Sequence, residues 1–453
     1  MRGTQYSLLL GIAVSLLGWT GCTRLESHAA PIPWTFGFWF WQGSSTESSS
    51  PRPVDALYIH AGDILQLDPN KQDAEWEVFG DIPRQLPPAK EYWIVFRYNR
   101  QGLPALEAIA PLARKIHSLR GIATQRNIPL AGVQLDVDSP TRALPAYADF
   151  LAQLRKQLPA GMQLSITCLL DWFRDGTSID GVIREVDEFV PQFYDVANPD
   201  NKQGGAVAAT IDPAVWGPQL NAFRKRYRIG VSTFGRARLT TGAAGALPSG
   251  SMFADLSPLE LAGNRAFRKS ASRNAAKEIV LRYEAVQRTE VGYNQFHPPM
   301  SLEFILPTAE SVRVAVEAAR KLQGYCAGVV FFRWPAPGET LTMSPEEVLA
   351  AAESNGARPP TPEIRTLNGG CATVVCTDLY LEHAPVAAEH PIRLRMESDS
   401  PLTYFISEKP ASVSNHDPLV LDMTLPEYLG RSSIYLGRAM TTEKSRFQLR
   451  EVQ

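Results

Sequence analysis

The chain has little excess charge of either sign. Its 453 residues include 45 Lys and Arg against 47 Asp and Glu, which leaves a net charge of −2. Nucleic acids and anionic membrane surfaces both select a strongly cationic partner surface, so we expect neither as the main partner. Hydrophobic residues at 44% and charged residues at 20% are ordinary globular values. The length fits two or three domains, or one large barrel with an appendage.

The N-terminal apolar run is too short to span a bilayer. It covers Leu8 to Leu17, follows Arg2 and precedes a small-residue cleavage site that ends at Gly21-Cys22. This pattern resembles a bacterial lipoprotein signal. The resemblance implies that residues 1–21 are removed and that Cys22 becomes the lipidated first residue of an exported, membrane-anchored protein.

Two further residues qualify this interpretation. Trp19 stands where such signals usually carry Leu, which leaves an ordinary secretory signal with a coincidental cysteine as the alternative. Thr23 is not the aspartate that tends to retain lipoproteins in the inner membrane. The resemblance therefore favours the outer membrane.

Cysteine is scarce. Apart from Cys22 the chain has Cys168, Cys326, Cys371 and Cys376, an even number that suits an oxidising compartment. The short spacing of Cys371 and Cys376 predicts a tight disulfide loop, whereas Cys168 and Cys326 lie in apolar segments typical of small buried side chains. No His or Cys stands nearby at ligand spacing, so we predict no metal site there.

A Gly-rich phosphate loop after an early strand is also missing, which removes the usual functional signature of a doubly wound open sheet. Instead, short apolar runs alternate with amphipathic helical stretches. Eight such runs within about 320 residues predict a (β/α)₈ barrel, an α/β fold, with the doubly wound sheet as second choice. The runs are Trp34–Trp41, Val54–His60, Tyr92–Tyr98, Ala131–Asp138, Gln163–Leu170, Glu188–Asp195, Tyr227–Phe234 and Ala327–Trp334.

The gap between the last two runs is longer than one crossover helix needs. It predicts an insertion after strand seven with strands at Glu278–Tyr283 and Leu302–Leu306. Alternating segments near the C-terminus, such as Ile392–Met396 and Leu402–Ile406, predict a small antiparallel β-sandwich. We therefore divide the chain into a signal peptide (1–21), a linker (22–32), the barrel (33–357), and a second linker with the sandwich (358–453).

The fourth run carries two carboxylates on one face. Strand alternation points Gln134, Asp136 and Asp138 into the barrel and the apolar residues between them toward the helices. Carboxylates about 7 Å apart repel, which raises the proton affinity of one while the other stays ionised. A proton donor beside a charged stabiliser is what glycosidic cleavage requires. The structural alternative is a helix cap or an internal ion pair with Arg97 or Arg333.

These residues resemble the chitinase-like glycoside hydrolases of family 18. Gly132 to Asp138 is similar to the fourth-strand Gly-x-x-Asp-x-Asp-x-Glu-like motif, with Gln134 and Asp138 replacing the first Asp and the terminal Glu. The sixth-strand Tyr-Asp pair corresponds to Tyr194-Asp195, the seventh-strand motif to Gly230 through Arg236, and the eighth-strand tryptophan to Trp334. The pattern also resembles an uncharacterised group of bacterial lipoproteins with a glycosidase-like barrel.

The resemblance implies a role for each matching residue. Asp138 is the general acid, and Asp136 orients and stabilises the substrate acetamido group, to which Tyr194 donates a hydrogen bond. Asp195 holds a sugar hydroxyl or the acetamido group, and Trp334 stacks under the reacting ring, with Arg236 also in the substrate site. Because Asp is one methylene shorter than Glu, a water-mediated inverting reaction or a loss of catalysis is compatible with the same residues.

Aromatic residues near the strand ends are candidates for sugar stacking. Tyr98, at the end of the third run, is a further polar candidate at the rim. The stacking candidates Trp39, Trp41 and Trp172 lie at or near the ends of the first and fifth runs. Core filling is the alternative for each of them.

The leading hypothesis is an exported, lipid-anchored glycoside hydrolase that acts on a polysaccharide such as one with N-acetylhexosamine, without a cofactor. An inactive barrel that binds glycan or assists envelope or exopolysaccharide assembly is the alternative. A metal-dependent hydrolase using Asp136, Asp138 and His60 has too few ligands. Ser232 lacks a nucleophile-elbow context.

Overall fold

The structure is a computed structural model. It describes residues 32–41, 44, 52–67, 75–100, 102–194, 196–197, 206–207, 210–240, 258–292, 294–337, 339, 341–354, 361–372, 374–408, 411–430 and 433–452. Cys22 and Asp195 lie outside the described residues. No helix within the described ranges is long and apolar enough to cross a membrane.

Eight parallel strands of the described chain close into a barrel, as predicted. β1 pairs with β2 on one side and with β17 on the other, and this second pairing closes the sheet. Each strand falls within or overlaps one of the eight predicted runs. The strands are β1 (Thr35–Phe40), β2 (Val54–Gln66), β4 (Ala89–Tyr98), β5 (Leu130–Val137), β6 (Gln163–Cys168), β7 (Glu188–Pro191), β10 (Arg226–Ser232) and β17 (Cys326–Phe332).

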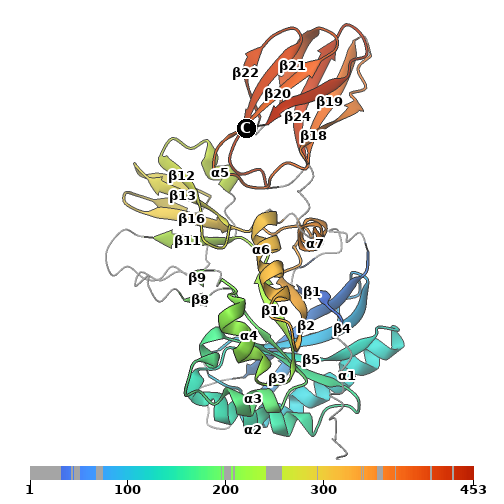
Figure 1. Ribbon diagram of the computed structural model, residues 1–453, viewed down its shortest axis with the longest axis vertical. Coiled ribbons are helices and arrows are strands. Elements are labelled where there is room, and N and C mark those ends of the chain that lie inside the picture. Colours follow the sequence, from blue (N-terminus) through green and yellow to red (C-terminus); the bar gives the residue numbers. More distant parts are fainter. Residues whose placement is uncertain are drawn as a thin grey trace, which may run out of the picture. The chain divides into compact units, whose positions relative to one another are not determined.

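Helices cover the outside of the barrel (Figure 1). Their apolar faces pack on the outward residues of the strands and form the largest buried core. α4 begins after Asp212, whose side chain accepts a hydrogen bond from Ala214 N, and α6 and α7 begin with capping boxes at Thr308 and Ser344. The helices are α1 (Ile109–Gln125), α2 (Leu144–Arg155), α3 (Ile179–Arg184), α4 (Pro213–Asn221), α6 (Ala309–Arg320) and α7 (Pro345–Glu353).

The amino end of the barrel is filled by a buried ionic cluster. Arg228 is fully buried and donates from Nη1 to Glu188 Oε2 at 2.9 Å and from Nη2 to Glu91 Oε1 at 2.7 Å. The Tyr58 hydroxyl also contacts Arg228 and Glu188. Above this cluster lies an aromatic layer that includes Trp39 and Trp93. The barrel is therefore packed through its middle, and only its carboxyl end is open to form a site.

A hairpin extends the barrel at the carboxyl end of β2. β2 pairs antiparallel with β3 (Trp76–Phe79), from Asp63 opposite Phe79 to Gln66 opposite Trp76. The backbones of the two strands lie in close contact at Gly62 and Gly80. A Cβ on Gly62 would lie 1.6 Å from the carbonyl oxygen of Phe79, and one on Gly80 would lie 1.6 Å from that of Ala61. Only glycine fits both positions, so this crossing fixes the hairpin against the barrel.

The predicted insertion after strand seven is confirmed. It contains a four-stranded antiparallel sheet in the order β11, β16, β13, β12, with its own buried core. A short hairpin, β14 and β15, was not predicted. The elements are β11 (Arg236–Thr240), α5 (Pro258–Ala262), β12 (Phe267–Arg273), β13 (Ile279–Ala285), β14 (Thr289–Val291), β15 (Asn294–Phe296) and β16 (Ser301–Leu306). The two-residue strands β8 (Val196–Ala197) and β9 (Ala206–Val207) lie between β7 and α4.

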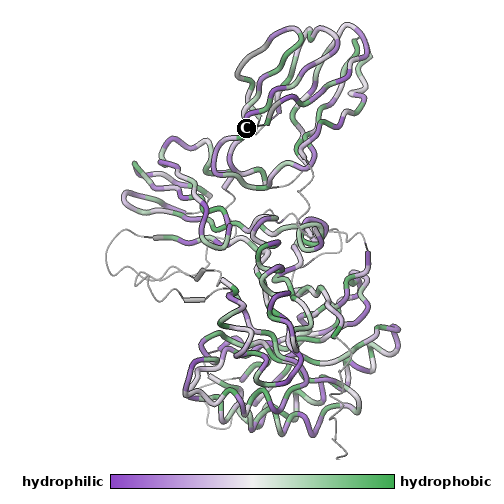
Figure 2. The backbone as a smooth tube through the Cα atoms, in the orientation of Figure 1, coloured by the Kyte–Doolittle hydropathy of each residue, from purple (hydrophilic) through white to green (hydrophobic). Residues whose placement is uncertain are grey.

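The C-terminal β-sandwich is confirmed as well. One sheet has the order β18, β19, β24, β21 and the other β22, β23, β20, β25, and both contribute to one apolar core. Hydrophobic and hydrophilic residues alternate along these strands (Figure 2). The strands are β18 (Glu363–Asn368), β19 (Val375–Glu382), β20 (Ile392–Ser398), β21 (Leu402–Ser407), β22 (Ser412–His416), β23 (Val420–Leu425), β24 (Ile434–Thr441) and β25 (Phe447–Val452).

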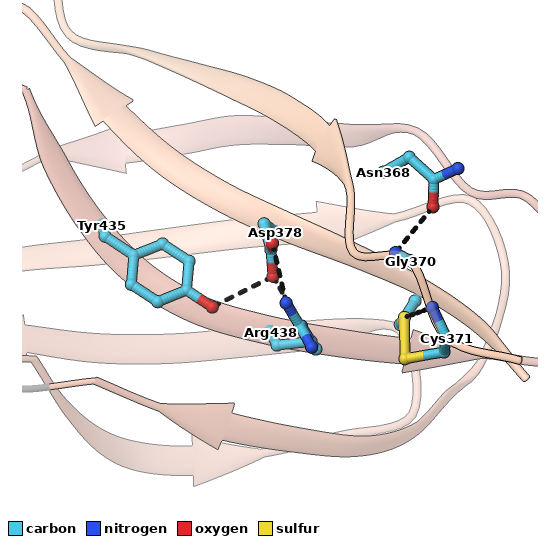
Figure 3. The surroundings of a disulfide bond; sticks show 7 residues. Asn368, Gly370, Cys371, Asp378, Tyr435 and Arg438 are labelled. Atoms are coloured by element: carbon cyan, nitrogen blue, oxygen red, sulfur yellow. Dashed lines mark hydrogen bonds and ion pairs between the residues drawn. A yellow bond between two sulfur atoms is a disulfide. The ribbon is translucent and has the colours of Figure 1, made fainter.

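The predicted disulfide joins Cys371 to Cys376 beside β19, and Cys168 and Cys326 are free and buried. Figure 3 shows the disulfide near Asp378, whose carboxylate accepts hydrogen bonds from Tyr435 and Arg438. Arg438 holds the pKa of Asp378 below its usual range. The limits predicted for the domains stay predictions.

Candidate functional site

Asp136 lies at the open end of the barrel, one residue before β5 ends. Its Oδ1 accepts a 2.7 Å hydrogen bond from Thr167 Oγ1 on β6, and its Oδ2 lies 3.6 Å from Arg97 Nε on β4. Burial, and then the charge of Asp138, raise the pKa of Asp136 to about 6, against the opposing effects of Thr167, Arg97 and Gln192. Asp136 therefore exchanges a proton near neutral pH.

Asp138 follows the strand and is exposed at the rim. The next residue, Ser139, is fully buried, and its carbonyl oxygen accepts a 2.7 Å hydrogen bond from Trp172 Nε1. Trp172 has no exposed surface. It therefore holds the backbone after Asp138 in place, which differs from the sugar-stacking role that the sequence suggested.

Aromatic and basic side chains lie beside the carboxylates. Trp41 stacks on His60, with ring centroids 4.4 Å apart, and the Arg97 guanidinium lies 5.8 Å from the Trp41 ring centre. Since Arg97 also contacts Asp136, it connects this aromatic pair to the carboxylate. Trp41 is partly exposed, as a stacking residue must be.

His60 is a polar group of this site that is short of partners. Its side chain is 6% exposed, and Nε2 lies 3.5 Å from Asp63 Oδ1 without a hydrogen-bond partner among the described residues. Burial lowers the pKa of His60, against an opposing effect of Asp63. The imidazole is therefore neutral at neutral pH.

Tyr194 and Phe332 form a second aromatic pair at the mouth. Their rings stack with centroids 5.1 Å apart, and Tyr194 packs edge-on against Trp39 at 6.0 Å. Trp39 itself is buried in the barrel interior and donates from Nε1 to Gln134 Oε1 at 2.8 Å. Tyr194 is 8% exposed and packs between Phe332 and Trp39, and Trp39 is a packing residue; the catalytic role of Tyr194 stays a prediction.

Three predicted substrate residues lie elsewhere. Trp334 has no exposed surface and packs against Phe38 and Phe40 in the core outside the barrel. Tyr98 points to the same core. Arg236 is buried, and its Nη2 donates to both carboxylate oxygens of Glu278 at 2.9 Å. A ring without exposed surface has no face for a sugar, and an arginine paired in this way stabilises the insertion.

The sequence analysis did not single out Thr167, Gln192 or Phe332, and it weighed His60 only as a metal ligand. Thr167 and Gln192 lie at inward positions of the predicted runs, so strand alternation would have found them. Phe332 was passed over in favour of Trp334.

A cavity of about 730 Å³ opens beside the mouth. Trp41 and His60 lie on the barrel side of it, and Asp63, Phe79 and Arg84 lie on the hairpin side. No group of three His, Cys, Asp or Glu side chains that would hold a metal ion occurs within the part of the chain that the structure describes.

Comparisons with known proteins add the following. A family model described as a domain of unknown function, DUF3142, matches residues 91–272, less than half of the chain. No curated protein matches.

Three of the solved structures that are similar to the chain are the following. The spore cortex-lytic enzyme SleL of Bacillus cereus is 11% identical with a TM-score of 0.43, over 71% of this chain and 75% of that one. Chitinase ChiA74 of Bacillus thuringiensis is 10% identical with a TM-score of 0.44, over 93% and 100%. A GH18 chitinase of Cycas revoluta, solved with (GlcNAc)₄, is 13% identical with a TM-score of 0.43, over 71% and 99%. The barrel fold that the motifs predicted is shown by the closed pairing of the eight parallel strands.

Proposed function

We propose that the protein is a glycoside hydrolase that cleaves a polysaccharide at the carboxyl end of its barrel, with N-acetylhexosamine polymers as the first candidates. The observation that carries the proposal is the arrangement of Asp136 and Asp138. Asp136 is partly buried, with its side chain 13% exposed and its pKa raised to about 6, and Asp138 lies two residues further on, exposed at the rim. One carboxyl that holds a proton beside one that is charged suits acid-assisted cleavage.

In this mechanism the two carboxyls share one proton, which rests on Asp136 before the reaction; it reaches the glycosidic oxygen through Asp138 and leaves Asp136 ionised. The bond between that oxygen and the anomeric carbon breaks, and the electron pair stays on the oxygen. Asp136 stabilises the positive charge that develops on the sugar, and a water molecule then adds its hydroxyl to the anomeric carbon and returns a proton to the carboxyl pair. Trp41, Tyr194 and Phe332 supply apolar surfaces for sugar rings.

Glycan binding without cleavage is the second candidate. It is favoured by Asp138, because the shorter side chain reaches less far than a glutamate at the same place. Release of reducing ends from envelope and exopolysaccharide substrates tests the first proposal. Turnover that depends on Asp138 supports the enzyme, and binding without turnover supports the glycan-binding protein.

We also propose that the protein is exported and anchored through a lipid on Cys22, in the outer membrane. The apolar run before Gly21-Cys22 supports this proposal. A surface anchor would bring the barrel to polymers of the cell envelope.

A further inference from the structure

The cavity beside the mouth is walled by two different parts of the chain. The ends of β1 and β2 contribute Trp41 and His60, and the β3 strand with the segment after it contributes Phe79, Asp81 and Arg84. Its volume of about 730 Å³ falls within the range of pockets that hold small organic ligands. None of these hairpin residues takes part in the mechanism proposed above.

The lining combines exposed aromatic rings with exposed polar groups. Phe79 is 47% exposed and lines the cavity, and it has no ring partner among the described residues, so its ring is accessible from the cavity. The carboxylate of Asp63 is 35% exposed, and Asp81 and Arg84 are exposed as well. Sugars present an apolar C–H face and a hydroxyl edge, and this lining offers a partner to each.

Contacts between side chains connect the wall of the cavity to Asp136. Trp41 lines the cavity, and Arg97 contacts both the Trp41 ring and Asp136. A glycan bound over Asp136 therefore needs only to extend toward β2 to reach the cavity.

The hairpin is built to hold Phe79 in one place. Gly62 and Gly80 let the two backbones touch on either side of it, and Phe79 lies opposite Asp63 in the strand register. The hairpin therefore holds the Phe79 ring and the Asp63 carboxylate in fixed positions at the cavity.

We propose that this cavity is a sugar-binding subsite, separate from the reacting position, in which Phe79 and Trp41 stack on one neutral sugar unit while Asp63, Asp81 and Arg84 bind its hydroxyls. The inference rests on the proposed function, and it places the next part of the bound glycan in this cavity. It predicts that the protein prefers longer oligosaccharides.

The test compares Phe79→Ala with Leu67→Ala by calorimetric binding of N-acetylglucosamine oligomers of two to six units. Leu67 is a matched control, because it is an exposed apolar residue at the loop end of the same hairpin and does not line the cavity. To keep cleavage from obscuring binding, both changes are made in an Asp138→Asn background. Melting curves of all variants check that each one folds.

In the subsite model the protein with the wild-type hairpin binds the longest oligomers more tightly than the shortest. Phe79→Ala lowers the affinity for the longest oligomers about 10-fold and leaves the affinity for the shortest unchanged. Leu67→Ala behaves like the wild-type hairpin. Equal length dependence in the two variants overturns the subsite but leaves the proposed function standing. Failure of every protein to bind any oligomer overturns both for this class of glycan. Arg84→Ala, an exposed change that leaves the hairpin crossing intact, gives a second measurement should Phe79→Ala fail to fold.

Discussion

Thr167 donates a hydrogen bond of 2.7 Å to the carboxylate of Asp136 from the neighbouring barrel strand. The hydroxyl stabilises the ionised form, so it holds down a pKa that burial and Asp138 have raised. The proton affinity of the site is therefore set by opposing contributions from adjacent strands.

Replacing Thr167 by Val should raise the pKa of Asp136 above about 6, because the hydrogen bond to its charged form is lost. Carboxyl carbon NMR titration of Asp136 measures this directly. Thr167→Ser keeps the hydroxyl and should leave the titration near the wild-type value. A lower pKa in Thr167→Val would contradict the assignment of this hydrogen bond.

The raised pKa of Asp136 also makes the stability of the fold depend on pH. Its value in the folded protein is above the ordinary 3.8, so protonation stabilises the fold below about pH 4 and this contribution is lost as pH rises through about 6. Asp136→Asn cannot ionise, so its free energy of unfolding should exceed that of the wild type by about 3 kcal/mol at pH 8 and match it near pH 4. Denaturant melts at both pH values test this, with the exposed Asp149→Asn on α2 as control.

Asp138→Asn should lower turnover by about 100-fold or more, because the side chain keeps its size but has no proton to give. Stability should hold or rise, since the variant removes the charge that repels the ionised form of Asp136. Hydrolysis rates and melting curves on one bound substrate provide the measurement. Severe destabilisation would instead identify Asp138 as a structural cap or ion-pair partner and end its catalytic assignment.

Trp334→Ala should mainly lower stability, whereas Phe332→Ala should mainly weaken oligosaccharide binding. The first removes a fully buried ring and should cost about 3–5 kcal/mol of stability. The second removes a half-buried ring at the mouth and should weaken oligosaccharide binding with a smaller loss of stability. Thermal unfolding with binding assays of both variants separates these effects. Selective loss of binding in Trp334→Ala would restore its role as the sugar platform.

Cys22→Ala should abolish acyl labelling and shift the protein out of the membrane fraction, because it removes the thiol that the lipid would modify. Metabolic labelling with a fatty acid and cell fractionation check this. Cys22 lies outside the described residues. Acyl labelling that persists in the variant would reject Cys22 as the lipidated residue.

The barrel strands were predictable because each carries its own signal. A buried parallel strand is a short apolar run, and Val133, Leu135 and Val137 mark the outward face of β5 as clearly in the sequence as in the structure. The β3 strand was missed, since its four residues, Trp76 to Phe79, are too few for a periodic pattern. The cavity that β3 lines therefore could not be predicted from the sequence.

The site was predictable only as far as the strands extend. Asp136 lies within β5, and its inward direction follows from alternation. β17 ends at Phe332, so alternation no longer applies at Trp334, and the aromatic residue that reaches the mouth is the earlier one. The partner of Arg236 is Glu278, 42 positions away, a pairing that no local pattern contains.

The ionic cluster around Arg228 and Glu188 limits the route by which a ligand can reach and leave the site. With that end of the barrel filled by paired charges beneath a layer of aromatic rings, no passage runs along the barrel axis. Whatever binds above Asp136 must arrive and depart through the same opening. A polymer can then be gripped only from the side or by one terminus, and fragments released by cleavage compete with new chains for that single opening.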